Sequence, residues 1–406
     1  MVKANKGAPG LDGVTVEQFG ANAEEEIERL SKELTKWVYK PRPVKRVEIP
    51  KPGSSEKRPL GIPCVRDRVV QQSLKISLEK LFEPEFSASS FGFRPDGGQQ
   101  KAIIQAREIV NRGKEWVVDI DLEKFFDLIN HDKVIQQLRS KVNDKGVLKL
   151  VGMTLRSGIF INGETIINER GSVQGSPLSP LISNIILDEL DKELEKRGLE
   201  FCRFADDCNI FVGSEKAGKR VMESISGFIE GRLKLKINVN KSKVALAKSV
   251  KFLGITIISG MVVISSVSMK RAMSKVREMI PRGSHFNLSQ QIGKVNQWYA
   301  GWSSYYSIAE VPSQLAVIEA HIRRRFRSQL IGNFKRKKYL VRKLIKMGVT
   351  PQTAKSVYRG GRWRTSIKRA VHQAWSNKWF ERQGLKVVSN QNLAHWNPLD
   401  LWIKPK

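Results

Sequence analysis

The sequence predicts an α+β body followed by a helical, strongly basic C-terminal region. Short apolar strands mix with longer helical patterns up to about residue 264, and beyond that point the apolar spacing is almost wholly helical, first from Ser268 to Leu330. The charge divides the chain in a similar way. Residues 320–406 hold 22 Lys and Arg against two acids, a net charge of +20. We therefore expect a mixed body that carries the acidic chemistry and a basic tail.

The overall composition narrows the class of partner. The chain has 406 residues and a formal charge of +31, from 71 Lys and Arg against 40 Asp and Glu. Such a surplus repels itself unless a polyanion is bound, so nucleic acid is the first candidate partner and an anionic membrane surface the second. No apolar run approaches the length of a bilayer span and no signal-peptide core is present, so we expect no membrane partner. Three cysteines without zinc spacing predict a reducing, cytoplasmic compartment.

The N-terminal part of the body is predicted from glycine, proline and apolar spacing. A glycine-rich loop covers residues 5–13, and a helix follows, with apolar residues three and four apart from Phe19 to Trp37. Prolines exclude a helix between residues 39 and 63, where residues 44–49 form a strand. Residues 66–82 are expected to be helical.

The rest of the body alternates between strands and helices. Residues 116–121 form an apolar strand that runs into a helical stretch, and residues 159–167 form a hairpin around Asn162-Gly163-Glu164. An apolar helix is expected from Gly175 to Leu194. A second hairpin, residues 252–264, turns at Ser259-Gly260.

The most informative stretch is Phe204-Ala205-Asp206-Asp207, between apolar strands at residues 201–204 and 208–212. This pattern puts both carboxylates on the tight connection of a β-hairpin. Adjacent acids repel, and a pair of divalent metals in a nucleotidyl-transfer site would offset that charge. Because Asp is also common in turns, the pair alone fits a plain turn equally well.

A two-metal site needs a carboxylate from outside this hairpin. The two cations lie about 4 Å apart, and two neighbouring side chains cannot bracket both. Asp121, at the end of the apolar strand 116–121, is the natural partner, and Asp119 is its competitor because alternation puts both on one strand face. Asp121 could also simply cap the helix that follows.

These residues resemble a known family. Phe204-Ala205-Asp206-Asp207 resembles the Tyr-Ala-Asp-Asp hairpin of reverse transcriptases, and residues 119–127 resemble their first catalytic-Asp block, in which the second Asp is the ligand. Further blocks match in order along the chain: Gly92-Phe93-Arg94-Pro95, residues 171–180, Lys241-Ser242, residues 250–254, residues 296–302 and residues 323–327. The chain is similar to the group II intron-encoded reverse transcriptases and maturases, and most of all to the bacterial group IIC type.

The resemblance implies a right-hand polymerase architecture. Residues 1–37 would be a shortened N-terminal extension with its glycine-rich loop, and residues 38–262 the fingers and a palm with an antiparallel sheet. Residues 263–330 would form an α-helical thumb, the maturase domain X, and residues 331–406 a small basic nucleic-acid-binding domain. No His-Asn-His cluster occurs in the tail, so no DNA endonuclease domain is expected.

The resemblance also implies a function. The protein would be an RNA-dependent DNA polymerase that extends a DNA or RNA primer on an RNA template, using dNTPs and two Mg²⁺ ions, with Mn²⁺ as a possible substitute. It would bind its intron RNA as a splicing maturase and act on target DNA during retromobility. Two alternatives stay open: a domesticated reverse transcriptase in DNA repair or phage defence, and a non-catalytic RNA-binding splicing factor.

Residue by residue, the resemblance assigns roles to matching positions. The metal ligands would be Asp121, Asp206 and Asp207, with Leu122 beside them. The nucleotide site would comprise Lys51 and Arg58 on the triphosphate, Phe126 as the ribose 2′-OH gate, Gln174 and Gly175 as the floor, and Lys241 near the leaving pyrophosphate. Nucleic acid would be bound by Arg323, Arg324, Arg325, Arg327, Lys335, Arg336, Lys337 and Lys338.

Three positions depart from the family's motifs. Phe204 replaces the usual Tyr, which removes a hydroxyl but no ligand. Val173 and Ser176 replace Pro and Gly in the block around Gln174, so the shape of the nucleotide pocket is expected to differ.

Overall fold

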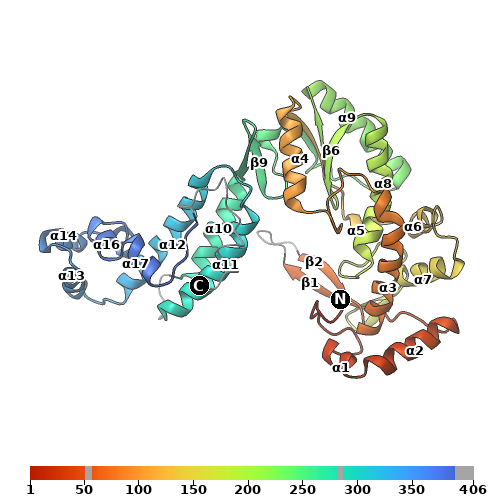
Figure 1. Cartoon of the computed structure of the whole chain (residues 1–406), viewed down its shortest axis with the longest axis horizontal. Helices are drawn as coiled ribbons and strands as arrows, with labels where there is room; N and C mark the ends of the chain where they lie inside the picture. The colour runs from red at the N-terminus through yellow and green to blue at the C-terminus, as the bar shows by residue number, and fades with distance from the viewer. Residues whose placement is uncertain (51–56, 282–286, 389–406) are drawn as a thin grey trace. The chain divides into compact units, whose positions relative to one another are not determined.

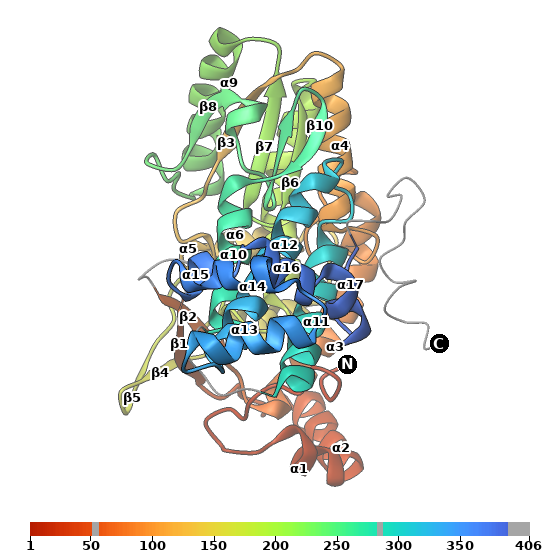
Figure 2. The same cartoon turned by 90° about the vertical axis from the view of Figure 1, so that its left-hand side faces the viewer.

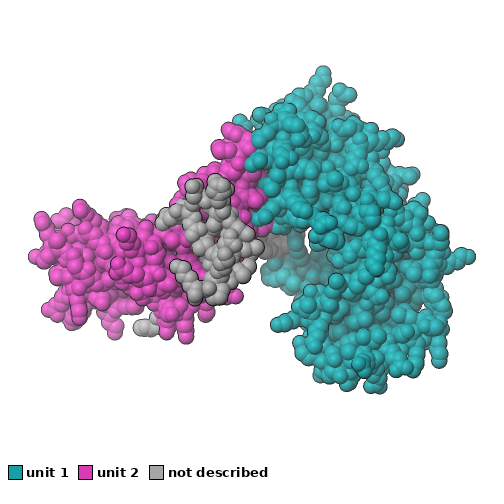
Figure 3. All heavy atoms as spheres, viewed as in Figure 1, with its two compact units in different colours: residues 1–250 teal, residues 251–406 magenta. Residues whose placement is uncertain are grey.

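The computed structural model describes residues 1–50, 57–281 and 287–388. It divides into two compact units, residues 1–250 and 251–406, which are coloured separately in Figure 3. In the described part of the chain, no helix is both long and apolar enough to cross a membrane.

A four-stranded antiparallel sheet organises the first unit. Its strands are β6 (Glu200–Phe204), β7 (Asp207–Val212), β3 (Trp116–Ile120) and β8 (Lys243–Leu246), in the order β6-β7-β3-β8. Every neighbouring pair is antiparallel. In β7 the five residues after Asp207 are all buried, whereas Asp207 itself is exposed. The apolar strand is therefore held inside the unit while its acidic start stands at the rim of the sheet.

Helices cover this sheet and complete its core. α9 (Glu215–Phe228) packs on β3, β7 and β8, whereas α4 (Gln99–Asn111) and α8 (Ser179–Lys196) contact β6 (Figures 1 and 2). Buried side chains from β3, α8 and β7, among them Val118, Ile186 and Ile210, belong to one apolar cluster. Each such side chain contributes about 1.5–3 kcal/mol by leaving water, so the sheet is a rigid platform for residues at its edge.

A second sheet takes two strands from before β3 and two from after it in the chain. It has the order β2-β1-β4-β5, from β1 (Val44–Pro50), β2 (Lys57–Ile62), β4 (Ile159–Ile161) and β5 (Glu164–Ile166). β1 pairs with β4 in parallel, and the other neighbours are antiparallel. The predicted strand 44–49 and the hairpin at residues 159–167 are confirmed. Asn162 and Gly163 both adopt positive φ, 51° and 94°, as a two-residue hairpin turn requires.

Two predicted helices have different bounds in the structure. The helix expected from Phe19 to Trp37 is two helices, α1 (Val16–Ala21) and α2 (Ala23–Thr35), because the chain leaves helical geometry at Asn22 (φ −116°, ψ 31°). The helix expected from Gly175 begins only at Ser179 and continues to Lys196. Gly175 has φ +109°, which no helical residue adopts.

Further helices and helical turns complete this unit. The remaining elements are α3 (Val65–Phe82), η1 (Glu83–Glu85), α5 (Phe125–Leu128), α6 (His131–Leu138), α7 (Lys145–Leu155), η2 (Ile229–Leu233) and η3 (Ala247–Ser249).

The second unit begins with a hairpin and is otherwise helical. β9 (Ile255–Ile258) and β10 (Met261–Ile264) turn at Ser259 and Gly260, as predicted. Glu310 Oε2 accepts the backbone N–H of Val262 (2.7 Å), which ties this hairpin to the helical region. The boundary between the two units, at Val250, thus precedes the hairpin, whereas the expected boundary of the fingers and palm lies at residue 262.

In residues 251–281 and 287–388, the described part of the second unit, three long helices are followed by five short ones and a 3₁₀ turn. They are α10 (Ser266–Met279), α11 (Leu288–Tyr305), α12 (Pro312–Gly332), α13 (Lys337–Lys346), α14 (Pro351–Lys355), η4 (Ser356–Tyr358), α15 (Arg362–Thr365), α16 (Arg369–Ala374) and α17 (Asn377–Arg382). A mixed body and a helical basic region confirm the α+β class.

Candidate active site

The β6–β7 hairpin carries the acidic pair as predicted. Phe204, the last residue of β6, pairs with Asp207, the first residue of β7, so Ala205 and Asp206 form the two-residue turn. Ala205 has φ 56° and lies in the left-handed region, where hairpin turns usually have glycine. Asp206 therefore stands on the turn itself and Asp207 on the first position of β7.

Asp121 lies beside this turn because of strand register. β3 ends at Ile120, which pairs with Cys208 on the antiparallel strand β7. Asp121, which follows Ile120, and Asp207, which precedes Cys208, therefore come to the same edge of the sheet. The backbone of Asp121 is fixed by two bonds. Its N–H donates to Ser242 Oγ (3.0 Å), and its carbonyl accepts the N–H of Asn238 (2.8 Å).

Asp119, the competing acid, has a different environment. It lies inside β3, opposite Asn209 on one side and Lys243 on the other. Burial raises the pKa of Asp119 to about 6, while the charge of Lys243 lowers it and that of Asp121 raises it. Asp119 is thus a carboxyl within the sheet, and Asp121 is the one at its edge.

Three of the predicted site residues, Asp206, Asp121 and Arg58, interact electrostatically in the structure. Burial raises the pKa of Asp206, and the nearby Asp121 carboxylate raises it further, whereas Arg58 and Arg203 lower it. Two carboxylates and the Arg58 guanidinium therefore share one electrostatic environment, although Arg58 comes from β2, in the other sheet. Lys241 adds a cation, with its Nζ 3.8 Å from Asp121 Oδ1.

The donor set suits a divalent cation that takes only part of its ligands from the protein. Within the described residues, no three His, Cys, Asp or Glu side chains are gathered closely enough to hold a metal ion by themselves. Mg²⁺, however, commonly binds through one or two carboxylates, with phosphate oxygens and water completing its shell. Asp121 and Asp206 repel each other in this edge site, and a cation between them would remove that penalty.

Leu122 can contribute to such a site only through its backbone. It forms an antiparallel bridge with Ile237, in which the N–H of Glu123 donates to the Lys236 carbonyl (2.8 Å). The backbones of Asp121 and Glu123 are bonded to the segment around Ile237. Because the backbone polar groups of successive residues point in alternate directions along an extended chain, the Leu122 carbonyl points away from that segment.

The predicted nucleotide-pocket residues are joined by one loop, residues 171–178. The N–H of Ser172 donates to the Phe126 carbonyl (2.7 Å), and the Gln174 carbonyl accepts the N–H of Gly61 on β2 (2.7 Å). A Cβ on Gly175 would stand 2.5 Å from the Gly61 carbonyl oxygen. The loop therefore ties the Phe126 segment to the strand that carries Arg58.

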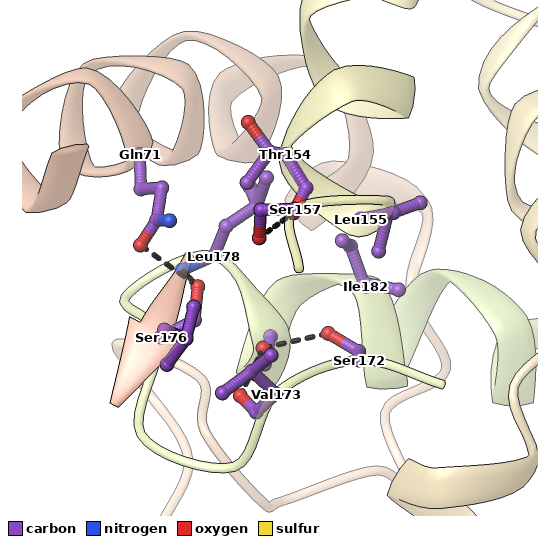
Figure 4. Close-up of a pocket in the computed structure, with 11 residues that line it drawn as sticks. Gln71, Thr154, Leu155, Ser157, Ser172, Val173, Ser176, Leu178 and Ile182 are labelled. Atoms are coloured by element: carbon purple, nitrogen blue, oxygen red, sulfur yellow. Dashed lines mark hydrogen bonds between the residues drawn. The ribbon is translucent and has the colours of Figure 1, made fainter. Parts of the chain in front are cut away.

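A cavity of about 10 Å³ lies under this loop, and both departing residues of the loop, Val173 and Ser176, line it. Ser176 Oγ donates to Gln71 Oε1 (3.0 Å), and Figure 4 shows the two side chains pointing toward each other. Ser172 and Ser179 share a second hydrogen bond (2.6 Å). At the other departure, the Val173 side chain fills the space beside Gly61, where a Cβ would meet it at 1.9 Å.

The aromatic pair after Asp121 divides its roles as expected. Phe125 is buried, whereas Phe126 is partly exposed and meets the Phe125 ring edge-on, with the ring centroids 5.2 Å apart. Lys51, the other predicted triphosphate contact, lies outside the described residues.

The predicted nucleic-acid-binding cations in the second unit fall into two groups. Arg325 and Arg327 are buried, at 6% and 3% exposure. Arg325 Nε donates to the Ile280 carbonyl (2.8 Å) at the end of α10, and Arg327 Nε donates to the Trp375 carbonyl (2.9 Å) at the end of α16. Both therefore join helices of this unit.

The other cations of this set lie nearer the surface. Arg323 and Arg324 are partly buried, and the Arg324 guanidinium lies over the Trp363 ring, 3.7 Å from its centroid. Residues 335–338 are all exposed at the start of α13. Of these four, Lys337 donates to the Tyr358 carbonyl (2.6 Å).

The sequence-based reasoning missed a buried network behind the hairpin. Arg203, on β6, has 0% exposure and forms an ion pair with Asp191 of α8, which also has 0% exposure. The same guanidinium donates to the Ala205 carbonyl (2.9 Å), in the turn that carries Asp206. An arginine inside the apolar run 201–204 was the available signal, because an apolar strand buries a charge only with a partner.

Comparison with known proteins places these elements in two family models. Residues 49–257, just over half of the chain, match the model described as reverse transcriptase (RNA-dependent DNA polymerase). Residues 269–348 match the model described as group II intron, maturase-specific domain.

Three curated proteins illustrate the similarity. Protein YkfC of Escherichia coli (strain K12) is 32% identical over 281 residues, which cover 59% of this chain and 74% of that protein. The putative COX1/OXI3 intron 2 protein of Saccharomyces cerevisiae is 31% identical, over 62% of this chain and 36% of its own length. The group II intron-encoded protein LtrA of Lactococcus lactis subsp. cremoris is 34% identical, over 49% of this chain and 33% of its own length. This chain thus spans only about a third of the latter two relatives.

Proposed function

The chain belongs to the reverse transcriptase family, and from this premise we propose that it extends a DNA or RNA primer along an RNA template with dNTPs, using Asp121, Asp206 and Asp207 as its acidic site. The observation that supports this most is the meeting of Asp121 and Asp206 at one edge of the palm sheet, within the electrostatic reach of Arg58. Carboxylates on a rigid sheet edge could hold two Mg²⁺ ions, or Mn²⁺, near a primer end and a triphosphate. Bound there, the metal would polarise the 3′-hydroxyl and offset phosphate charge.

The chain's own residues would bind and orient the nucleotide. Arg58 offers a guanidinium that can engage two phosphate oxygens at once. Lys241, whose Nζ lies 3.8 Å from Asp121 Oδ1, is placed to meet the charge of a leaving pyrophosphate beside the acidic site. Both cations lie on exposed surface, at 59% exposure for the Lys241 side chain, so they can reach a substrate from solution.

The loop 171–178 and Phe126 would select the sugar and base. The Phe126 ring is partly exposed, and its backbone is bonded to Ser172 of the loop. A ring over the sugar rejects a ribose 2′-hydroxyl by collision. Gln174 and Gly175 lie next in the same loop, so one backbone segment connects the ring with the floor of the pocket.

A maturase role follows from the second matched model, and we propose that the second unit binds intron RNA and template–primer. The exposed cations at residues 335–338 can contact phosphates, and Lys338 Nζ lies over the exposed Tyr339 ring, 5.3 Å from its centroid. Cations with neighbouring aromatics are typical of surfaces that follow a single strand. Target DNA, the group IIC subgroup and a bacterial cytoplasmic location are predictions of the sequence motifs and belong to the same proposal.

Primer extension on an RNA template tests the polymerase proposal. We expect Mg²⁺-dependent extension by the wild type, its loss in Asp121→Asn and Asp206→Asn, and a much smaller effect of Asp119→Asn, which also probes which strand acid is the ligand. Extension that survives Asp206→Asn would reject the assigned site. Absence of extension by the wild type, together with accelerated splicing of the RNA transcribed around the gene, would favour the non-catalytic splicing factor instead.

A further inference from the structure

The hairpin turn that carries Asp206 is strained and needs support from its surroundings. Ala205 has φ 56° and is buried at 5% exposure. An alanine at such a φ persists only where neighbouring groups hold it, because its Cβ crowds the following carbonyl. The groups that hold this turn therefore decide where the Asp206 carboxylate points.

Arg203 supplies that support with its whole guanidinium. An arginine has five N–H donors, and here all five bonds are formed inside the protein. Nε donates to Asp191 Oδ1 (2.7 Å), and Nη2 donates both to Asp191 Oδ2 (2.5 Å) and to Ser90 Oγ (2.7 Å). Nη1 donates to Asn184 Oδ1 (3.1 Å) and to the Ala205 carbonyl (2.9 Å).

The partners of Arg203 are themselves locked together. Asn184 Nδ2 donates to the Gly92 carbonyl (2.9 Å), and a Cβ on Gly92 would stand 2.2 Å from the Ala205 nitrogen. The Phe91 N–H donates to the Arg203 carbonyl (2.8 Å). The segment around residue 91, the helix α8 and the hairpin turn thus form one continuous unit with Arg203 at its centre.

Net stability alone does not account for this arrangement. Burying two charges costs desolvation energy, and apolar side chains of similar volume often serve a fold as well or better. What apolar side chains cannot do is fix the carbonyl of a strained turn at a defined position. The direction of the fifth hydrogen bond, toward Ala205, therefore indicates a positioning role.

We propose that the buried Arg203–Asp191 pair is a positioning device for the acidic site: by holding the Ala205 carbonyl, it orients the Asp206 carboxylate toward a divalent cation. This inference rests on the proposed function, because it takes Asp206 to be a metal ligand. Arg203 and Asp191 touch neither substrate nor metal in this scheme. They act through the turn, as outer hydrogen-bond partners act on the ligands of other metal sites.

Asp191→Asn tests the proposal, with Asp67→Asn as its matched control. Both are isosteric changes of a buried carboxyl in the first unit, at 0% and 1% exposure. Asp67 accepts from the Tyr39 hydroxyl (2.7 Å) and the Arg42 N–H (3.1 Å), and neither partner belongs to the hairpin. The melting temperature in the presence of a chelator reports what each change costs the fold.

The decisive readout is Mn²⁺ binding to the full chain without nucleic acid or dNTP, measured by calorimetry. We expect Asp191→Asn to weaken Mn²⁺ binding by about tenfold, as loss of an outer partner does at other metal sites. Asp67→Asn should keep wild-type affinity at a comparable loss of melting temperature. In primer extension, Asp191→Asn should raise the Mg²⁺ concentration for half-maximal rate while the KM for dNTP stays unchanged.

The result that overturns the proposal is wild-type Mn²⁺ affinity and Mg²⁺ dependence in Asp191→Asn, whatever its melting temperature. If Asp191→Asn does not fold, Ser90→Ala and Asn184→Ala each remove one bond from the guanidinium, and the proposal requires weakened Mn²⁺ binding in at least one of them. Failure of the proposed function would give a different result. The Asp206→Asn variant would then bind Mn²⁺ with the same affinity as the wild type, and neither the wild type nor any variant would show primer extension.

Discussion

Gly175→Ala is the substitution whose effect the structure defines most sharply. Gly175 has φ +109°, and a Cβ there would stand 2.5 Å from the Gly61 carbonyl oxygen. That carbonyl cannot simply withdraw, because the N–H of the same Gly61 donates to the Gln174 carbonyl (2.7 Å). An alanine must therefore push the loop away from β2, and Gln174 moves with it.

The free-energy cost of Gly175→Ala has two parts, one from the backbone φ and one from the displaced loop. A left-handed or more extreme φ costs an L-residue about 1–2 kcal/mol, and a forced shift in a packed region costs about 1–3 kcal/mol more. We expect Gly175→Ala to lower the free energy of unfolding by about 2–5 kcal/mol. If Gln174 lines the nucleotide pocket, its displacement should raise the KM for dNTP by about tenfold, equivalent to about 1.4 kcal/mol of binding.

Gly198→Ala separates the two parts. Gly198 also has positive φ, +66°, but a Cβ there meets nothing within 4 Å. The Gly198→Ala variant should lose only the free energy that the unfavourable φ costs, about 1–2 kcal/mol, and should keep the wild-type KM for dNTP. Urea unfolding and steady-state primer extension measure both quantities. Equal unfolding free energies and equal KM values for the two variants would refute the steric reasoning.

Four further predictions follow from the site and the basic region. Asp206→Asn should raise the melting temperature in a chelator while abolishing primer extension, because burial and a neighbouring negative charge both disfavour this carboxylate. His131 is buried with a lowered pKa, so stability should fall as pH drops below its ordinary value of 6.5, and His131→Gln should remove that part of the pH dependence of unfolding. Ser176→Ala should cost about 1–3 kcal/mol by leaving Gln71 Oε1 without its donor, and a double change with Gln71→Leu should cost less than the sum. Replacing the cations of residues 335–338 by Gln should lower the salt slope of RNA binding by about 0.7 for each phosphate that the variant no longer neutralises.

Each of these has an outcome that would count against it. A lower melting temperature for Asp206→Asn in chelator would show that this carboxylate is not penalised by burial. Identical pH profiles with and without His131 would remove that residue as the titrating group. Stability falls at low pH because of the surroundings of the His131 ring. Nε2 donates to the Gly171 carbonyl (2.7 Å), while Nδ1 has no hydrogen-bond partner among the described residues. Protonation of Nδ1 therefore costs the folded state more free energy than it costs the unfolded chain. Additive costs for Ser176→Ala and Gln71→Leu would mean that the two side chains act independently, and an unchanged salt slope would place RNA binding away from residues 335–338.

Local patterns were sufficient to predict the elements that carry the acids. Strands at residues 201–204 and 208–212 and the strand ending near residue 121 were predicted from apolar runs bounded by a tight turn, and all three occur. These elements depend on neighbouring residues, which is why a sequence window contains enough information to find them.

Other features depended on register and could not be chosen from one strand alone. Asp119 and Asp121 lie on the same strand face, so alternation treats them equally. The structure separates them because β3 ends at Ile120 and pairs Asp119 with Asn209 and Lys243. Which acid reaches the sheet edge is a property of three paired strands.

Burial of the cations was the least predictable property. The run at residues 323–327 has the composition of a nucleic-acid-binding face, yet Arg325 and Arg327 are buried against carbonyls that lie 45 and 48 residues away in sequence. Arg203 was missed for the same reason, since its partners come from α8 and from the segment near Ser90.

The strands that carry the acids, the position of the acidic hairpin, the surplus of positive charge and the family resemblance could all be predicted without a structure, because each depends on residues close together along the chain. The acid beside the turn, the arginines that face solvent and the arginine that supports Asp206 became known from the folded chain. Those outcomes depend on hydrogen-bond partners that distant segments bring together, and a charged side chain is buried only where such partners are found.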